Sequence, residues 1–254
     1  MIKTIDLTVS YGEENILEDI NVEIKEKERT IILGPNGTGK STFLNTIVGR
    51  LAPRKGQVYY GETPVQEIPK RELARKVSYI PQMHNSVFDF KVIDVVLMGR
   101  TPHMSYFSTP RKEDYLIAET YMEEMGIYHL RNKYYTEISG GERQTVLITS
   151  ALCQEAETII LDEPTSHLDF GKSYLFIEKM DKLNKERNIG VIMTTHFPDH
   201  ALQLGGNCIL IKDQSIFAEG KVEEVLTEEK LSEVYGVEIK KGKIFNKNIC
   251  VITA

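Results

Sequence analysis

A short glycine-rich segment near the N-terminus constrains this chain more than any other part. Residues 34–41 read GPNGTGKS, and they follow the apolar run 30–33 and precede a helix-like run over 42–50. The segment fits the pattern G-x-x-x-x-G-K-[ST] in the strand, loop, helix context of phosphate-binding loops. A chance match in a chain of this length has a probability on the order of one per cent, since Gly makes up about 7% of residues on average.

The chemistry of such a loop needs these residue types. Glycine lets several backbone N–H groups converge on a triphosphate, because a Cβ would block the required turns and close approaches. The start of the following helix adds unpaired amides, the lysine ammonium reaches the β and γ phosphates, and the serine hydroxyl binds Mg²⁺. The candidate nucleotide-binding residues here are Asn36, Gly37, Thr38, Gly39, Lys40, Ser41 and Thr42.

Composition indicates a globular cytosolic protein. The chain has 254 residues and is 41% hydrophobic, which is enough for a sizeable core. No stretch approaches the roughly 18 apolar residues of a membrane span, and the start MIKTIDLTVSYG lacks the apolar centre of a signal peptide. The net charge is −6 with scattered Lys and Arg, which argues against nucleic acid as a partner. Three widely spaced cysteines are expected to be reduced and structural.

The periodicity of apolar residues predicts an α/β fold. Residues 2–9 and 20–24 alternate as antiparallel strands do, and residues 56–60 and 76–80 read as short strands. From residue 85 to residue 153, apolar residues recur at spacings of three and four, which predicts an inserted helical subdomain. We therefore expect one domain over 1–254: a P-loop NTPase core (1–84 and 154–254) with a mainly parallel sheet, an antiparallel β subdomain, and a helical subdomain (85–153). From residue 207 on, short strands and two small helices carry no recognisable chemistry.

Polar residues follow several predicted strands. The run 158–161 is continuously apolar, as in a central parallel strand, and it ends in Asp162 and Glu163. At the carboxyl end of such a strand, one carboxylate can help to bind Mg²⁺ while its neighbour polarises water. His196 follows a second buried strand (190–194), and Gln82 follows the strand at 76–80, where it can contact Mg²⁺ or water.

Two further features each allow two interpretations. Tyr11 is either a rim residue that packs on a neighbour or a flat face on which adenine stacks. Ser139 is either a simple N-cap or, with Gly140 and Gly141, the start of a helix that forms a second anion site.

The order of these motifs is specific. GPNGTGKS, Gln82, ISGGERQ, TIILDEPTSHLD and a TTH that ends at His196 closely resemble the ATP-binding cassette (ABC) ATPases over essentially the whole chain. Ile138, Glu142 and Thr145 depart from the commonest form of the ISGGERQ segment. The resemblance implies that Tyr11 stacks on adenine, that Ser41, Gln82 and Asp162 surround Mg²⁺, that Glu163 is the general base, and that His196 touches the γ phosphate. It also implies that Ser139, Gly140 and Gly141 bind the nucleotide of an opposite subunit.

The same resemblance implies partners and a location. It predicts an ATP-sandwiched homodimer, transmembrane permease subunits, an indirect link to a substrate-binding protein, and a peripheral place at the cytoplasmic face of the membrane. The segment VIDVVLMGRTPH, the histidine at position 167 and residues 220–238 look like importers for iron chelates, heme and cobalamin. Two other classes stay open: an ABC ATPase of a soluble assembly or repair complex, and a phosphate-loop kinase or non-hydrolysing nucleotide-binding module.

Overall fold

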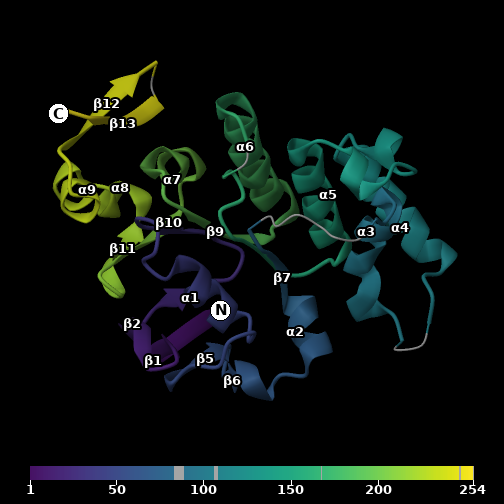
Figure 1. Cartoon of the computed structure of the whole chain (residues 1–254), viewed down its shortest axis with the longest axis horizontal. Coiled ribbons are helices and arrows are strands. Elements are labelled where there is room, and N and C mark those ends of the chain that lie inside the picture. The colour runs from purple at the N-terminus through teal and green to yellow at the C-terminus, as the bar shows by residue number, and fades with distance from the viewer. Residues whose placement is uncertain (83–88, 106–107, 167, 246, 254) are drawn as a thin grey trace.

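In the computed structural model, which describes residues 1–82, 89–105, 108–166, 168–245 and 247–253, the central element is a six-stranded sheet in the order β11-β10-β4-β9-β8-β7 (Figure 1). Neighbouring strands from β10 to β7 run parallel, and β11 is antiparallel to β10 at one edge. The strands are β4 (Arg29–Leu33), β7 (Val77–Ile80), β8 (Thr158–Leu161), β9 (Gly190–Thr195), β10 (Asn207–Lys212) and β11 (Ser215–Lys221). This mainly parallel sheet is the one that the sequence predicts.

Both faces of the central sheet are covered, which explains the continuous apolar runs. Along β4, Ile31 and Leu33 join one buried cluster with the helices α5, α6 and α7, whereas Ile32 joins another with α1 and the antiparallel sheet. Alternate residues of β8 and β9 divide between the two clusters in the same way. A strand with two buried faces cannot alternate with polar residues, because successive side chains point to opposite faces.

The antiparallel sheet lies below the central one in Figure 1 and has the order β2-β1-β5-β6, with β3 also paired to β1. Its strands are β1 (Ile2–Tyr11), β2 (Glu14–Ile20), β3 (Glu23–Ile24), β5 (Lys55–Tyr60) and β6 (Thr63–Pro64). The predicted strand at 2–9 is confirmed and is longer. The predicted strand at 20–24 covers the last residue of β2 and both residues of β3, each antiparallel to β1, whereas residues 14–19 of β2 were not predicted. Register shifts in the β1–β2 pair leave Leu17 and Ile20 buried at a spacing of three, which hides the strand period in residues 14–20.

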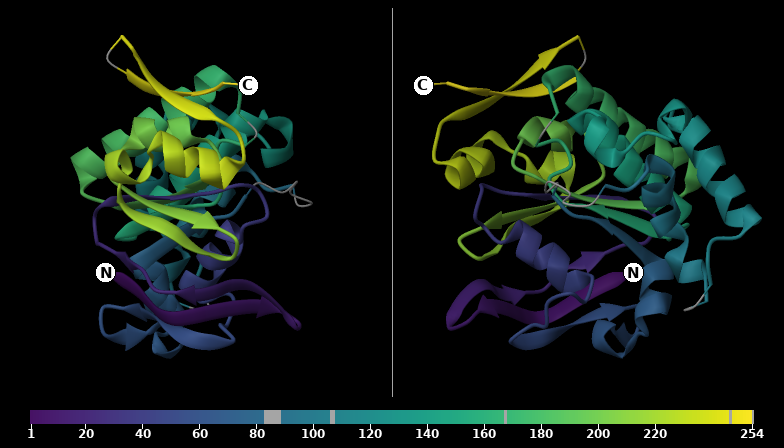
Figure 2. Two further views of the ribbon diagram at one scale, coloured as in Figure 1. Left: turned by 90° about the vertical axis from the view of Figure 1, so that its left-hand side faces the viewer. Right: turned by 45° about the vertical axis from the view of Figure 1, so that its right-hand side comes forward.

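Helices cover the sheets and form a group beside them. They are α1 (Lys40–Ile47), α2 (Lys70–Lys76), α3 (Val92–Leu97), α4 (Lys112–Glu124), α5 (Gly140–Cys153), α6 (Phe170–Arg187), α7 (Pro198–Leu204), α8 (Val222–Val225) and α9 (Glu228–Tyr235). The helices α3, α4 and α5 lie together at one side of the molecule (Figure 1). The chain ends in a hairpin of β12 (Ile239–Ile244) and β13 (Lys247–Ile252) (Figure 2). The predicted subdomain boundary at 84/85 falls within 83–88, outside the described residues.

One buried hydroxyl in the central sheet generates a stability prediction. Thr30 of β4 is 2% exposed, and its Oγ1 has no hydrogen-bond partner within the part of the chain that the structure describes. Thr30→Val keeps the side-chain shape and removes this unsatisfied group, so it should raise the free energy of unfolding by about 1 kcal/mol. Urea unfolding measures the change. A loss of stability would mean that this hydroxyl has a partner after all.

Candidate nucleotide-binding site

The glycine-rich loop joins the end of β4 to the start of α1. Gly37 and Gly39 have φ angles of 82° and 93°, in the left-handed region that favours glycine. At Gly34, a Cβ would lie only 2.5 Å from the carbonyl oxygen of Ile211. These turns and this close approach bring the loop to the N-terminus of α1, where the first N–H groups lack partners within the helix.

Lys40 holds its ammonium group inside the loop. Its side chain is 4% exposed, and Nζ donates to the carbonyl oxygens of Gly34 and Pro35, both at 2.9 Å. The same Nζ lies 3.3 Å from Oε1 of Glu163. A positive charge is therefore fixed between the phosphate loop and the end of β8.

Asp162 is a buried carboxylate that accepts three hydroxyl groups. It is 3% exposed. Its Oδ1 accepts from Ser41 at 3.0 Å and from Thr194 at 2.7 Å, and its Oδ2 accepts from Tyr79 at 3.3 Å. Burial and the Asp162 charge raise the pKa of Tyr79, so this phenol stays protonated and able to donate. Charge-assisted hydrogen bonds of this kind stabilise a carboxylate in a site with little water.

Glu163 and His196 meet at the carboxyl end of the sheet. Oε1 of Glu163 lies 3.6 Å from Nδ1 of His196, in addition to its contact with Lys40. Glu163 has a φ of 43°, which is uncommon for a non-glycine residue and turns the chain sharply after β8. Its backbone N–H donates to Oγ1 of Thr194 at 2.8 Å, which holds this turn in place.

Sequence reasoning missed Thr194 and Tyr79. Thr194 accepts from the Glu163 backbone and donates to Asp162, so one hydroxyl fixes both acidic residues. Its role depends on the register between β8 and β9, which no local pattern reveals. One sequence feature could have indicated it: Thr194 is a hydroxyl residue near the end of a buried strand that is followed directly by a candidate catalytic histidine.

A cavity of about 420 Å³ brings most of the predicted residues together. Gln82 and Glu163 line it together with residues of the phosphate loop. Thr38 belongs to the same loop, where its hydroxyl donates to the Pro35 carbonyl at 3.0 Å. The cavity is lined by Ile16, Asn36, Gly37, Gly39, Lys40, Ser41, Thr42, Gln82 and Glu163. Of these, only Ile16 in β2 was not predicted, because the strand that carries it was not recognised.

Tyr11 does not line this cavity. It is the last residue of β1, next to the hairpin turn into β2, and is 56% exposed. Its stacking on adenine stays a prediction.

Ser139, Gly140 and Gly141 lie at the start of α5 and not at the phosphate loop. The Ser139 side chain accepts from the Glu142 backbone at 3.4 Å, while Oε2 of Glu142 accepts from the Ser139 backbone at 2.8 Å. This capping box is the N-cap that the sequence allows. A second cavity of about 310 Å³ between α5 and α6 is lined by Ser139 and Gly141 together with residues of α6. Within one chain, the structure thus keeps this segment apart from the phosphate-loop cavity.

A neutral histidine supports the segments around His196. Nδ1 of His200 lies 3.1 Å from the Thr195 hydroxyl and 3.4 Å from that of Thr165. Burial and the nearby His196 lower the pKa of His200 to about 4, so its imidazole is uncharged at neutral pH and its Nδ1 can accept these hydroxyl groups.

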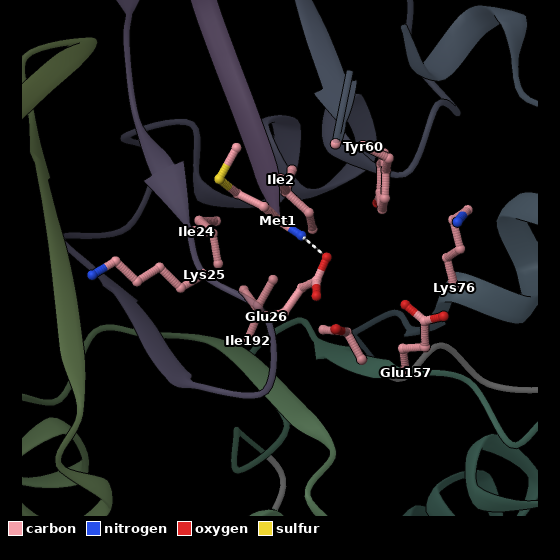
Figure 3. Close-up of a pocket in the computed structure, with 11 residues that line it drawn as sticks. Met1, Ile2, Ile24, Lys25, Glu26, Tyr60, Lys76, Glu157 and Ile192 are labelled. Carbon is pink, nitrogen blue, oxygen red and sulfur yellow. Dashed lines mark hydrogen bonds and ion pairs between the residues drawn. The ribbon is translucent and has the colours of Figure 1, made fainter. Parts of the chain in front are cut away.

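Another pocket, of about 110 Å³, lies at the opposite end of the parallel strands (Figure 3). Glu157 and Lys76, which line it, come directly before β8 and β7, and the Met1 amine in it pairs with Glu26. It contains no residue of the phosphate loop. It therefore does not belong to the candidate site.

The predicted Mg²⁺ ligands have suitable chemistry. Among the described residues, no three or more His, Cys, Asp or Glu side chains gather to bind a metal ion. A magnesium ion in a phosphate-loop site needs few protein ligands, because water and phosphate oxygens supply the rest. Ser41 and Asp162 lie 3.0 Å apart, and Gln82 lines the same cavity as Ser41, so the oxygen donors fit the ion.

Thr194→Val tests how the two acidic residues are held. The substitution keeps the shape but leaves the Glu163 N–H without an acceptor and removes a donor from Asp162. It should lower the free energy of unfolding by about 1 to 3 kcal/mol, measured by urea unfolding. Thr30→Val is the matched control in the neighbouring strand and should change stability in the opposite direction. Equal shifts for both variants would contradict this account of Thr194.

Comparisons with known proteins agree with this geometry. A family model described as ABC transporter matches residues 17–166. An uncharacterized ABC transporter ATP-binding protein of Haemophilus influenzae is 38% identical and covers 92% of this chain and 89% of its own length. The iron(3+)-hydroxamate import ATP-binding protein FhuC of Bacillus subtilis is 32% identical and covers 98% of this chain and 94% of its own length.

Solved structures show the same fold. A metal-chelate type ABC transporter in an inward-facing conformation matches with a TM-score of 0.86 and 27% identity over 99% of this chain and 96% of its own. A dimeric, post-hydrolysis ATP-binding cassette bound to ADP and Pi matches with a TM-score of 0.73 and 29% identity over 87% of this chain and 99% of its own. The predicted P-loop NTPase fold is confirmed, and the chain belongs to the ABC transporter family as an ATP-binding and ATP-hydrolysing subunit.

Proposed function

We propose that this chain hydrolyses ATP to power the uptake of a metal chelate, of the iron-siderophore, heme or cobalamin type, through separate membrane subunits. The observation that carries the proposal is the position of Glu163, 3.3 Å from the Lys40 ammonium and 3.6 Å from His196 at the phosphate-loop cavity. The class of cargo is supported by the similarity to an iron-hydroxamate import protein and to a metal-chelate type transporter.

In this proposal, each part of the site has one task. The loop amides and Lys40 bind the ATP phosphates. Glu163 accepts a proton from the water that attacks the γ phosphorus in line, and His196 stabilises the charge that develops on the γ phosphate. Mg²⁺, bound by Ser41, Gln82 and Asp162, supplies further neutralisation of phosphate charge.

The base of ATP has a proposed place beside the same cavity. Tyr11 stacks on one face of the adenine, and Ile16, which lines the cavity, adds apolar contact. Both residues belong to the β1–β2 hairpin, so this hairpin positions the base while the loop positions the phosphates.

The start of α5 completes the site of a second copy. Ser139 caps the N-terminus of α5, where the N–H groups of Gly140 and Gly141 have no partner within the helix, and in one chain this segment lies away from the phosphate-loop cavity. We infer that two chains face each other with two ATP molecules between them, so that each α5 start contacts the γ phosphate bound by the other chain. A dimeric structure of a related cassette supports this arrangement.

The helical subdomain has a proposed role in coupling ATP hydrolysis to transport. We propose that residues 85–153 form a helical subdomain that moves against the core of residues 1–84 and 154–254 and passes that motion to permease subunits. Among the described residues, none of the helices has the length and apolar character needed to cross a bilayer. The chain would then bind peripherally at the cytoplasmic face, and a substrate-binding protein would deliver the cargo on the other side. The histidine at position 167 that supports this subgroup lies outside the described residues.

Purification from detergent-solubilised membranes tests the transport assignment. The tagged chain should co-purify in stoichiometric amount with a protein of many membrane spans, and the complex should hydrolyse ATP faster when the chelate and its binding protein are added. A stoichiometric soluble scaffold in place of a membrane protein would instead assign the chain to a soluble assembly or repair complex.

Glu163→Gln should trap the ATP-bound dimer. The amide keeps the size of the side chain but cannot accept a proton, so the hydrolysis rate should fall about 10²- to 10⁴-fold while ATP still binds. In sedimentation experiments, this variant should shift from monomer to dimer when ATP and Mg²⁺ are added.

Gly140→Asp in the same background tests the facing geometry. Among the described residues beyond its neighbours in the helix, none lies within 4 Å of a Cβ built at Gly140, so the side chain fits the monomer, whereas its charge would repel the γ phosphate of the other chain. This double variant should bind ATP and stay monomeric, and Gly140→Ala is the control that adds only the Cβ. Dimerisation of the aspartate variant at undiminished strength would refute the proposed role of the α5 start.

A further inference from the structure

The C-terminal segment of the chain contacts the loop that carries His196. This segment comprises α8, α9 and the β12–β13 hairpin, and it lies against α7 at one end of the molecule (yellow in Figures 1 and 2). Its sequence carries no recognisable catalytic motif. Its contacts with α7 and with the residues before α7 are nevertheless specific.

The most direct contact comes from the last residue of α9. The hydroxyl of Tyr235 donates to the backbone carbonyl of His196 at 2.9 Å. The Tyr235 ring packs against the larger buried core, and Gly236 ends the helix in the left-handed conformation with a φ of 70°. Burial near Cys208 and Cys250 raises the pKa of Tyr235, so its hydroxyl remains a donor.

The carbonyl that accepts this hydrogen bond belongs to the short connection between β9 and α7. β9 ends at Thr195 and α7 begins at Pro198, so only His196 and Phe197 join the two elements. The Phe197 N–H donates to the Thr195 hydroxyl at 3.1 Å, and the Phe197 ring lies 4.0 Å from the His196 ring, centroid to centroid. Because the imidazole extends from this connection, a hydrogen bond that fixes the 196–197 peptide restricts the backbone that carries the ring.

A second contact holds the next helix. The backbone N–H of Cys250 in β13 donates to Oδ1 of Asp199 at 2.8 Å, and Asp199 lies in the first turn of α7. The hairpin also reaches α6, where the Lys247 ammonium contacts the hydroxyl of Tyr174. The C-terminal segment is thus anchored on α7 and α6 as well as on the connection between β9 and α7.

We propose that Tyr235 is a positioning residue for His196, so that the C-terminal segment takes part in ATP hydrolysis by fixing the histidine against the γ phosphate. The proposal rests on the proposed function, in which His196 stabilises the transition state. Tyr235 transfers no proton and touches no substrate. Its removal should therefore affect the chemical step and leave nucleotide binding by the phosphate loop unchanged.

Steady-state kinetics of Tyr235→Phe in the full-length chain test this proposal. The variant loses only the hydroxyl, and kcat for ATP hydrolysis should fall about three- to tenfold with an unchanged KM for ATP. Titration with ATP under non-turnover conditions counts the intact sites, so that rates refer to folded protein. Tyr60→Phe is the matched control, because the Tyr60 hydroxyl also donates to a backbone carbonyl, that of Ile47 at 3.0 Å. This control should retain both kcat and KM.

Each outcome separates the positioning role from a structural one. A lower kcat with constant KM in Tyr235→Phe alone supports the proposal. An unchanged kcat, a KM that rises together with the loss of kcat, or an equal loss in Tyr60→Phe would overturn it while leaving the ATPase assignment intact. Absence of ATP hydrolysis by the unmodified chain would instead overturn the proposed function and this inference with it.

Discussion

The site depends on the register of three parallel strands, β4, β9 and β8, whose carboxyl ends lie side by side in the central sheet. Leu33 of β4 pairs with Thr195 of β9, and Leu161 of β8 pairs with Met193 of β9. The residues that follow these strands therefore leave the sheet together. They are the first glycine of the phosphate loop, the acidic pair, and the histidine. A shift of one residue in either pairing would turn alternate side chains to the opposite face and separate these groups.

At the carboxyl ends of these strands, the buried charge of Asp162 determines how the neighbouring side chains are arranged. Asp162 is almost fully buried, and a carboxylate in such a place is costly unless hydrogen bonds replace its water. Thr194, Ser41 and Tyr79 supply these hydrogen bonds from β9, α1 and β7. The same Thr194 hydroxyl accepts from the backbone N–H of Glu163. The hydroxyl that stabilises the Asp162 charge therefore also fixes the backbone of Glu163. The carbonyl oxygens of Gly34 and Pro35 accept from the Lys40 ammonium and so hold it within reach of Glu163.

The sequence predicts those parts of the fold and site that local chemistry determines. The glycine pattern, the continuous apolar runs before Asp162 and His196, and the helical spacing within residues 85–153 each report a local requirement. The structure has the phosphate loop, the buried strands β8 and β9, and the helices α3, α4 and α5 in these places. Contacts between segments far apart in the chain could not be predicted. Thr194 meets Asp162 through strand pairing, Tyr79 meets Asp162 across 83 positions, and Tyr235 meets His196 across 39. The strand β2 was missed because a bulge in its pairing with β1 disturbs the alternation on which strand prediction depends.

In the proposed reaction, this site directs a water molecule at the γ phosphorus of ATP. Hydrolysis in water enriched with ¹⁸O, followed by mass spectrometry of both products, tests it directly. Inorganic phosphate should gain one oxygen from solvent and ADP should gain none, because the bond that breaks lies between the γ phosphorus and the bridging oxygen. Label in ADP, or transfer of the phosphoryl group to an acceptor without release of labelled phosphate, would contradict it.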